Sequence, residues 1–401
     1  MNQNNHRTPL HHAALNGQTR TVELLLASGA CLEALDYDSN TPLQLAVWKN
    51  HAGVVELLLA NSASVQAINR YSNTPLHLAV WNGHIGIVEL LLWEGALIEA
   101  KNLYRYTPLH LASLRGHTGV VKLLLRKGAL IEAIDRGRNT PLNLATRSGH
   151  TGLVELLLAK GASFTTRNML DNTPLHLAAQ NGHASLVELL LAKGASFSAI
   201  NESDDTPLHL ATQSGHTGLV ELLLAKGASP HTRNMLGNTP LHLAAQDGHT
   251  TIVENLLGNG ASIEPISKTG NTPMHLAARG GHTSTVERLL GNGASVDPEP
   301  ESTDIYDTTP LQIAASEGHT GVVELLLRFG ASIEAPNWFG DTPLHLASYS
   351  GFTDTVGLLL KKGAFVGARN GNYKTSLQLA IEKGHVDLVE LLFANGASIH
   401  D

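Results

Sequence analysis

Histidine is the residue type with the most evident chemical potential in this sequence, because imidazole can bind zinc and can move protons near neutral pH. The chain holds 22 histidines. Eighteen of them recur in two fixed contexts, one after Thr-Pro-Leu or Thr-Pro-Met and one after Gly or Asn. No cysteine partner and no His-Glu-x-x-His pattern accompanies them. We therefore expect a structural role for nearly all of these histidines, and neither a metal ion nor another cofactor.

Other catalytic patterns are also missing from the sequence. It contains no Gly-x-Ser-x-Gly elbow, no phosphate-binding loop and no dinucleotide fingerprint after a strand. The single cysteine, Cys31, falls in a turn-like segment without an evident base beside it. We therefore expect that the chain is not an enzyme.

The histidines recur because the whole sequence repeats. Each repeat opens with Thr-Pro, or in one case Thr-Ser, and the openings are 33 residues apart except for one step of 37. The opening residues are Thr8, Thr41, Thr74, Thr107, Thr140, Thr173, Thr206, Thr239, Thr272, Thr309, Thr342 and Thr375. The longer step, between Thr272 and Thr309, holds four extra residues. We expect a hinge or bulge at residues 296–307, where they fall.

One repeat, residues 172–204, shows which elements must position these side chains. Thr173 is a good helix N-cap, and Pro174 suits the first helical position. Apolar residues spaced as on one helix face follow, and Gly182 is suited to end this short helix. A second helix is predicted over residues 184–193. Because neither helix is long enough to be stable alone, the repeats must stack on one another.

A 33-residue period that carries Thr-Pro-Leu-His-x-Ala resembles the ankyrin-repeat family. The resemblance covers essentially all 401 residues. It implies an all-α solenoid of about twelve helix-turn-helix repeats with short hairpin-like turns, forming a single domain over residues 1–401. It also implies that the recurring imidazoles hydrogen-bond to backbone between repeats, and that the protein is a non-catalytic binding scaffold.

The composition limits which classes of partner and which cellular compartments fit this chain. The formal net charge of −8 disfavours nucleic acid as a general partner. A lone cysteine favours a reducing compartment, the N-terminus has no secretory h-region, and no apolar run could span a membrane. We therefore expect a monomeric cytoplasmic protein without membrane contact, with the nucleus as the alternative location.

Acidic residues occupy one turn position in half of the repeats, where the ankyrin family usually has Asn. We expect these carboxylates to accept backbone N–H groups within the row of turns. They are Glu33, Glu99, Glu132, Glu264, Asp297 and Glu334.

Large apolar residues stand at positions that the repeat does not need, namely the turn tips and the end of each first helix. Turn tips are ordinarily polar because they face water, and exposed aromatic clusters mark interaction surfaces. The predicted N-terminal patch contains Tyr37, Trp48, Tyr71, Trp81, Tyr104 and Leu114. The predicted second patch contains Ile305, Tyr306, Trp338, Phe339 and Tyr349. The alternative is that neighbouring tips pack on and shield one another.

A basic stretch follows the N-terminal patch. Residues 101–150 hold nine Lys/Arg and two Asp/Glu, a net charge of +7 in an acidic chain. The arginines predicted to share the face of the turn tips are Arg105, Arg115, Arg136, Arg138 and Arg147. An acidic peptide is the natural ligand for such a band, by charge-assisted pairing.

These observations predict a scaffold or adaptor that binds another protein along its concave face. The expected ligand is an extended or helical segment with acidic and hydrophobic residues, lying along repeats two to five. The alternative is a nuclear regulator, such as a transcription coregulator, that uses the same surface, although no nuclear-import cluster is visible.

Overall fold

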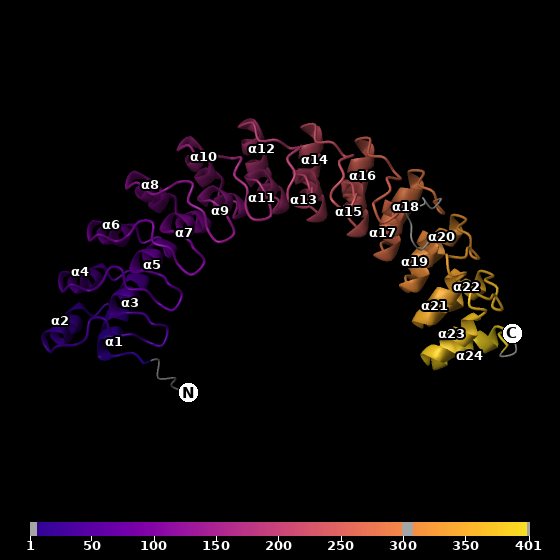
Figure 1. Ribbon diagram of the computed structural model, residues 1–401, viewed down its shortest axis with the longest axis horizontal. Helices are drawn as coiled ribbons and strands as arrows, with labels where there is room; N and C mark the ends of the chain where they lie inside the picture. Colours follow the sequence, from indigo (N-terminus) through magenta and orange to yellow (C-terminus); the bar gives the residue numbers. More distant parts are fainter. Residues whose placement is uncertain (1–5, 299–307, 399–401) are drawn as a thin grey trace. The chain divides into compact units, whose positions relative to one another are not determined.

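The computed structural model describes residues 6–298 and 308–398, which contain 24 helices and no strand. The chain divides into two compact units, which we call the N-terminal half (Met1–Ser196) and the C-terminal half (Phe197–Asp401). Within each half the repeats stack in chain order (Figure 1), so the predicted all-α solenoid architecture is confirmed. The single-domain prediction over 1–401 stays a prediction.

Each repeat contributes a short first helix and a longer second helix. In the N-terminal half the helices are α1 (Pro9–Leu15), α2 (Thr19–Ala27), α3 (Pro42–Trp48), α4 (Ala52–Ala60), α5 (Pro75–Trp81), α6 (Ile85–Trp93), α7 (Pro108–Arg115), α8 (Thr118–Arg126), α9 (Pro141–Arg147), α10 (Thr151–Ala159), α11 (Pro174–Gln180) and α12 (Ala184–Ala192). In the C-terminal half they are α13 (Pro207–Gln213), α14 (Thr217–Ala225), α15 (Pro240–Gln246), α16 (Thr250–Gly258), α17 (Pro273–Arg279), α18 (Thr283–Gly291), α19 (Pro310–Ser316), α20 (Thr320–Arg328), α21 (Pro343–Ser350), α22 (Thr353–Lys361), α23 (Ser376–Lys383) and α24 (Val386–Ala394).

The helices begin and end where the sequence predicts. In the repeat at residues 172–204, the Thr173 side chain caps α11 and Pro174 is its first residue. Helix α11 ends before Gly182, whose φ of 73° lies in the left-handed region that glycine adopts without strain. The second predicted helix, over 184–193, is α12 with Lys193 as its C-cap.

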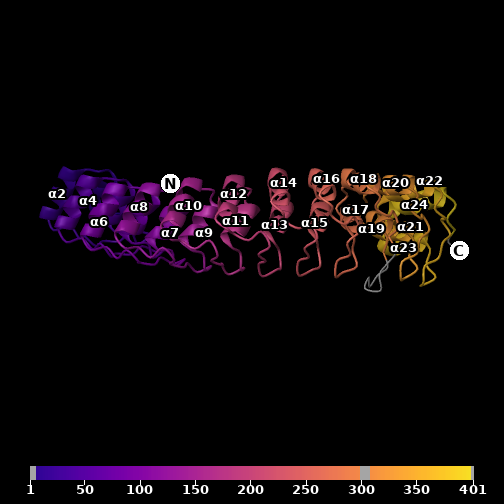
Figure 2. The ribbon, with the colours of Figure 1, turned by 90° about the horizontal axis from the view of Figure 1, so that it is seen from above.

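Stacking of the repeats buries the apolar stripes of both helices. First helices pack on first helices, as α5 does on α7, and second helices pack on second helices, as α6 does on α8. The hairpin tips extend from one edge of each half (Figure 2). The first helices and tips therefore form one layer of each half, and the second helices form the other.

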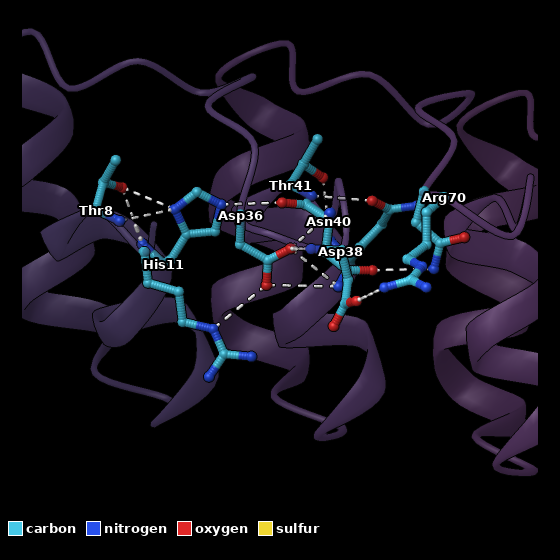
Figure 3. Close-up of polar contacts among 10 residues, drawn as sticks. Thr8, His11, Asp36, Asp38, Asn40, Thr41 and Arg70 are labelled. Atoms are coloured by element: carbon cyan, nitrogen blue, oxygen red, sulfur yellow. Dashed lines mark hydrogen bonds and ion pairs between the residues drawn. The ribbon is translucent and has the colours of Figure 1, made fainter. Parts of the chain in front are cut away.

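Histidine in the Thr-Pro-Leu-His position links each repeat to the next. The Thr8 backbone N–H donates to Nδ1 of His11 (3.1 Å), and Nε2 of His11 donates to the Asn40 carbonyl of the following repeat (3.0 Å), as Figure 3 shows. The side-chain amide of Gln44 makes the equivalent bonds. Its oxygen accepts the Thr41 N–H (2.9 Å), and its nitrogen donates to a carbonyl of the next repeat. The expected structural role of these side chains is confirmed.

Histidine in the Gly-His position links each repeat to the one before. Nε2 of His51 donates to the Leu15 carbonyl (3.0 Å). Its ring lies against Gly17, where a Cβ atom would come within 2.6 Å of Nδ1 of His51. Gly17 also has a φ of 68°. Glycine is therefore required here for both space and backbone conformation.

The acidic turn position has the role that the sequence predicts. Glu99 Oε1 accepts the backbone N–H of Leu130 (2.8 Å), 31 residues later in the next repeat. All six acids accept the equivalent hydrogen bond. The backbone N–H donors belong to Ser64, Leu130, Ser163, Ser295, Ser332 and Phe365. These carboxylates are therefore part of the stack. The predicted hinge at 296–307 lies mostly outside the described residues and stays a prediction.

Asn143 is the weak member of the row of inter-repeat links. It occupies the histidine position of repeat five, and its buried Nδ2 has no hydrogen-bond partner among the described residues. Its Oδ1 accepts from the hydroxyl of Thr166 (3.0 Å). The shorter side chain therefore leaves a buried donor unpaired, which costs free energy.

Asn143→His should raise the free energy of unfolding of the N-terminal half by about 1 kcal/mol, because the imidazole can span to the next repeat. Repeat seven already combines His209 with Thr232 in the same two positions, so Thr166 leaves room for the ring. Urea titration of the full chain followed by circular dichroism measures the change. A variant no more stable than the wild type would show that Asn143 is not a weak link.

Candidate partner-binding groove

A groove of about 740 Å³ opens across repeats one to four of the N-terminal half. One wall comes from the ends of the first helices, with Trp48 from α3, Trp81 from α5 and Leu114 from α7. Tyr71 and Tyr104, from two successive hairpin tips, form the other. The remaining lining residues are Arg7, Leu15, Asp38, Asn40, Gln44, Leu45, Lys49, Asn69, Asn73, His77, Leu78, Asn102, Tyr106 and Leu111.

Structural histidines hold the helix-end wall in place. Each one donates to the carbonyl of the residue whose side chain forms the wall. His84 donates to the Trp48 carbonyl (3.3 Å), and His117 to the Trp81 carbonyl (3.0 Å). The Leu114 carbonyl accepts from the histidine of repeat five in the same way. The spacing of the two tryptophans is therefore set by the repeat and does not depend on a ligand.

Backbone hydrogen bonds hold the tip wall in place. The Leu103 N–H donates to the Tyr71 carbonyl (3.0 Å), and the Arg136 N–H donates to the Tyr104 carbonyl (3.1 Å). Within one tip, Oδ1 of Asn102 accepts the Tyr104 N–H (3.0 Å). Consecutive tips are thus joined to one another, and the tyrosines project from a continuous row.

The floor of the groove is polar, but its groups are largely paired within the protein. Asn69 donates to Oδ1 of Asn40 (3.0 Å), and Asn102 donates to Oδ1 of Asn73 (2.9 Å). Burial lowers the pKa of His77 to about 4, so this imidazole is neutral at pH 7. Apart from Arg7, Asp38 and Lys49, the lining residues carry no charge at pH 7, so a ligand gains most from burying apolar side chains.

Arginines lie at the rim of the groove. The Arg115 guanidinium lies 4.8 Å from the centre of the Trp81 ring, and that of Arg70 lies 5.0 Å from the centre of the Tyr71 ring. Arg70 also pairs with Asp38 (2.9 Å). Arg115, in contrast, makes no ion pair among the described residues. Its charge is therefore available to an acidic ligand beside an aromatic wall.

Comparison with known proteins accounts for this architecture. A family model described as ankyrin repeats (3 copies) matches residues 1–69, 76–168, 165–234, 219–300, 297–370 and 336–401, and a second one, ankyrin repeats (many copies), matches 49–92. The chain belongs to the ankyrin-repeat family. Ankyrin repeats are generally protein–protein interaction modules, and the fold is typically a non-catalytic binding scaffold.

Among solved structures, the crystal structure of the human ASB11 ankyrin repeat domain is similar to this ankyrin chain. The two share 30% sequence identity with a TM-score of 0.52, and the match covers 57% of this chain and 99% of that domain. No curated protein matches this chain.

The ankyrin stack brings together most of the predicted N-terminal patch. Trp48, Tyr71, Trp81, Tyr104 and Leu114 all line the groove. Tyr37 does not line it, although its side chain is 70% exposed. The arginines predicted beside the patch are exposed and, among the described residues, make no ion pair, but none of them lines the groove. They are Arg105, Arg115, Arg136, Arg138 and Arg147.

Sequence reasoning missed Tyr106 and the paired asparagines of the floor. The Tyr106 ring lies 6.0 Å from that of Tyr104, and its carbonyl accepts from His77 (3.0 Å). A signal was present in the sequence, because Tyr106 directly precedes its opening Thr, where most other repeats have Asn or Asp.

The second predicted patch is only partly described. Trp338, Phe339 and Tyr349 are 77%, 50% and 50% exposed, while Ile305 and Tyr306 lie outside the described residues. The Lys383 ammonium lies 4.1 Å from the centre of the Tyr349 ring. Tyr373, which the sequence prediction did not include, is 78% exposed in the next tip. These side chains are exposed to solvent, and their assignment to a second binding patch stays a prediction.

Within residues 6–298 and 308–398, no group of three or more His, Cys, Asp or Glu side chains is placed to hold a metal ion. None of the helices in these ranges has the length and apolar character needed to cross a bilayer.

Proposed function

We propose that the chain is a non-catalytic scaffold or adaptor that receives a segment of a partner protein in the groove of its N-terminal half. The observation that carries the proposal is the groove itself, whose walls are aromatic and held in place before any ligand binds. A preformed site saves the ligand the free energy of ordering the receptor.

Stacking of the repeats does not require the aromatic side chains of the groove walls. The helix-end position that holds Trp48 and Trp81 holds Gln213 and Gln246 in two later repeats, which fold in the same way. Large, exposed aromatic residues at positions free to vary are typical anchors of protein interfaces. Selection for binding, rather than for folding, explains them best.

The chemistry of the groove favours a segment with both apolar and acidic residues. Apolar side chains would fill the space between the tryptophans and tyrosines. Carboxylates would pair with Arg115 at the rim and, further along repeats four and five, with Arg136 and Arg147. Nucleic acid is disfavoured because this basic band is short and the chain as a whole carries a charge of −8.

The proposal is tested by affinity purification of the tagged chain with quantitative mass spectrometry, run beside Arg115→Glu/Arg136→Glu/Arg147→Glu. We expect the triple variant to capture much less of one partner than the wild type does. At low salt, the association rate of that partner with the triple variant should be about tenfold or more below its rate with the wild type. The cause is lost electrostatic steering, so the difference should shrink as salt is added.

Lys160→Glu/Lys193→Glu/Lys226→Glu is the matched control for this experiment. It makes the same change in net charge on exposed residues that follow second helices. Equal loss of the partner from both triple variants, or no protein that distinguishes them, would count against an acidic ligand at this surface.

A further inference from the structure

The second-helix layer carries another unusual surface, on the side of the N-terminal half away from the groove. It consists of exposed residues of repeats three and four, from helices α6 and α8 and the turns after them. The apolar members are Trp93, Leu97 and Leu130, which are 82%, 62% and 61% exposed. The charged members, all exposed, are Glu89, Glu94, Lys122, Arg126 and Lys127. We call this set the outer patch.

The outer patch departs from the repeat pattern at several positions at once. Lys122 stands fifteen residues after its opening Thr, where ten of the twelve repeats have Glu. Trp93 and Arg126 stand four positions further on, where six repeats have Ala. Leu97 and Leu130 stand where eight repeats have Ser. These departures fall in two neighbouring repeats and leave the fold unchanged, so stacking does not explain them.

Some charges elsewhere on the second-helix layer pair with the adjacent repeat. Arg288 pairs with Glu254 (2.6 Å), and Arg328 with Glu287 (3.4 Å). In contrast, the described residues contain no ion pair of Glu89, Glu94, Lys122, Arg126 or Lys127. The charges of the outer patch are therefore available to another molecule.

The two repeats of the outer patch are complementary position by position. Glu89 corresponds in the repeat to Lys122, and Glu94 corresponds to Lys127. Trp93 corresponds to Arg126, and these two side chains can form a cation–π contact. Leu97 corresponds to Leu130, and these two can form an apolar contact. No other pair of adjacent repeats has opposite charges at both acid–base positions.

We propose that the outer patch joins two copies of this chain about a twofold axis that lies between α6 and α8 and runs parallel to them. A rotation of 180° about that axis places α6 of one copy opposite α8 of the other, with the helices parallel and in register. All four combinations then form between copies, and each forms twice. This is the self-complementarity that a twofold interface demands.

Membrane binding is the other reading of an exposed Trp beside basic residues. The outer patch disfavours it, because Glu89 and Glu94 flank Trp93 and would face an anionic bilayer. Only two helices of each copy meet, so the interface is small and the dimer should be weak, in the micromolar range. The dimer would leave both grooves open. It would therefore bind a partner that presents two segments more tightly than the monomer does.

Sedimentation of the full chain across concentrations tests the proposal. The wild type should pass from 42.6 kDa towards twice that mass. Lys122→Glu/Lys127→Glu should weaken the dimer about tenfold or more, because like charges then face each other in four places. Adding Glu89→Lys/Glu94→Lys to that variant should restore it. Lys160→Glu/Lys193→Glu, with the same change in net charge, should dimerise like the wild type.

A disulfide trap tests the register. On a Cys31→Ser background, chains with Trp93→Cys mixed with chains with Arg126→Cys should form a mixed disulfide between copies. Chains with Ala192→Cys mixed with chains with Ala225→Cys, the same positions in repeats six and seven, should not. Circular dichroism confirms that each variant is folded.

Three results would overturn the proposal. One is a monomeric wild type up to several hundred micromolar. Another is a dimer that the double charge reversal leaves intact, or that the compensating reversal fails to restore. The third is a monomer that binds vesicles of phosphatidylserine and phosphatidylcholine through Trp93, which would assign the outer patch to a lipid surface.

Discussion

Trp48→Ala combined with Trp81→Ala should weaken binding of the partner segment at least about 100-fold. The two indoles lie at equivalent positions of adjacent repeats and form the helix-end wall of the groove. Truncation of a central aromatic anchor costs about 2 kcal/mol or more, and two anchors in one groove remove most of the apolar contact. The Arg115 guanidinium also loses the ring over which it lies.

The fold should survive this double substitution. Trp48 is 41% exposed, and the carbonyls of both residues accept from His84 and His117 through the backbone, which alanine retains. Titration of the captured partner against wild-type and variant chains measures the change in Kd, and circular dichroism checks the fold. Gln213→Ala/Gln246→Ala removes side chains from the same positions in two other repeats and should leave Kd unchanged. Full binding by the tryptophan variant would remove the groove from the site.

His77→Gln combined with His242→Gln should remove much of the acid sensitivity of the two repeats that hold these histidines. Burial lowers the pKa of His77 to about 4 and the pKa of His242 to about 4. The unfolded chain binds these protons near pH 6.5, whereas the folded chain resists them. Stability is therefore fully present above pH 6.5 and is lost as the pH falls from 6.5 towards 4. The loss approaches about 3 kcal/mol for each histidine.

Glutamine is a suitable replacement because the stack already uses it. In the same position, Gln44 accepts the Thr41 N–H (2.9 Å) and donates to the Ala67 carbonyl (3.1 Å) and the Asn73 carbonyl (2.8 Å) without a titratable group. Stability at pH 7 should thus change little, and the difference between pH 7 and pH 4.5 should shrink.

Hydrogen exchange of α5 and α15 at the two pH values, corrected for intrinsic rates, measures local stability in each repeat. This readout suits a repeat array, which need not unfold in one step. The control is His51→Gln, which changes a histidine of the Gly-His position and should leave the acid sensitivity of α5 intact. An unchanged pH dependence in the double glutamine variant would show that these two histidines do not limit stability in acid.

The repeat itself could be predicted from the sequence because its causes are local. Thr followed by Pro (Ser in the last repeat) starts each first helix, Gly (Asn in repeat two) follows its end, and the apolar spacing selects the buried face. A 33-residue period therefore suffices to place every described helix. The same locality explains the roles of the histidines and of Glu99, since each bonds a backbone group at a fixed offset. The expectation that Trp48 and Trp81 would be available for binding also came from their departure from the repeat.

Which of these side chains share a groove was decided by the tertiary structure. Tyr37 and Tyr71 both stand at hairpin tips in sequence, yet only Tyr71 lines the groove. Tyr71 and Tyr104 stand three residues before their opening Thr, whereas Tyr37 stands four residues before, and from the first tip it is Asp38 that lines the groove. Tyr106 also joins the groove, beside Tyr104. The sequence by itself determined a stack of ankyrin repeats and the positions free to vary within it. Only the packing of successive repeats, at distances that no local pattern encodes, turned some of those positions into a groove.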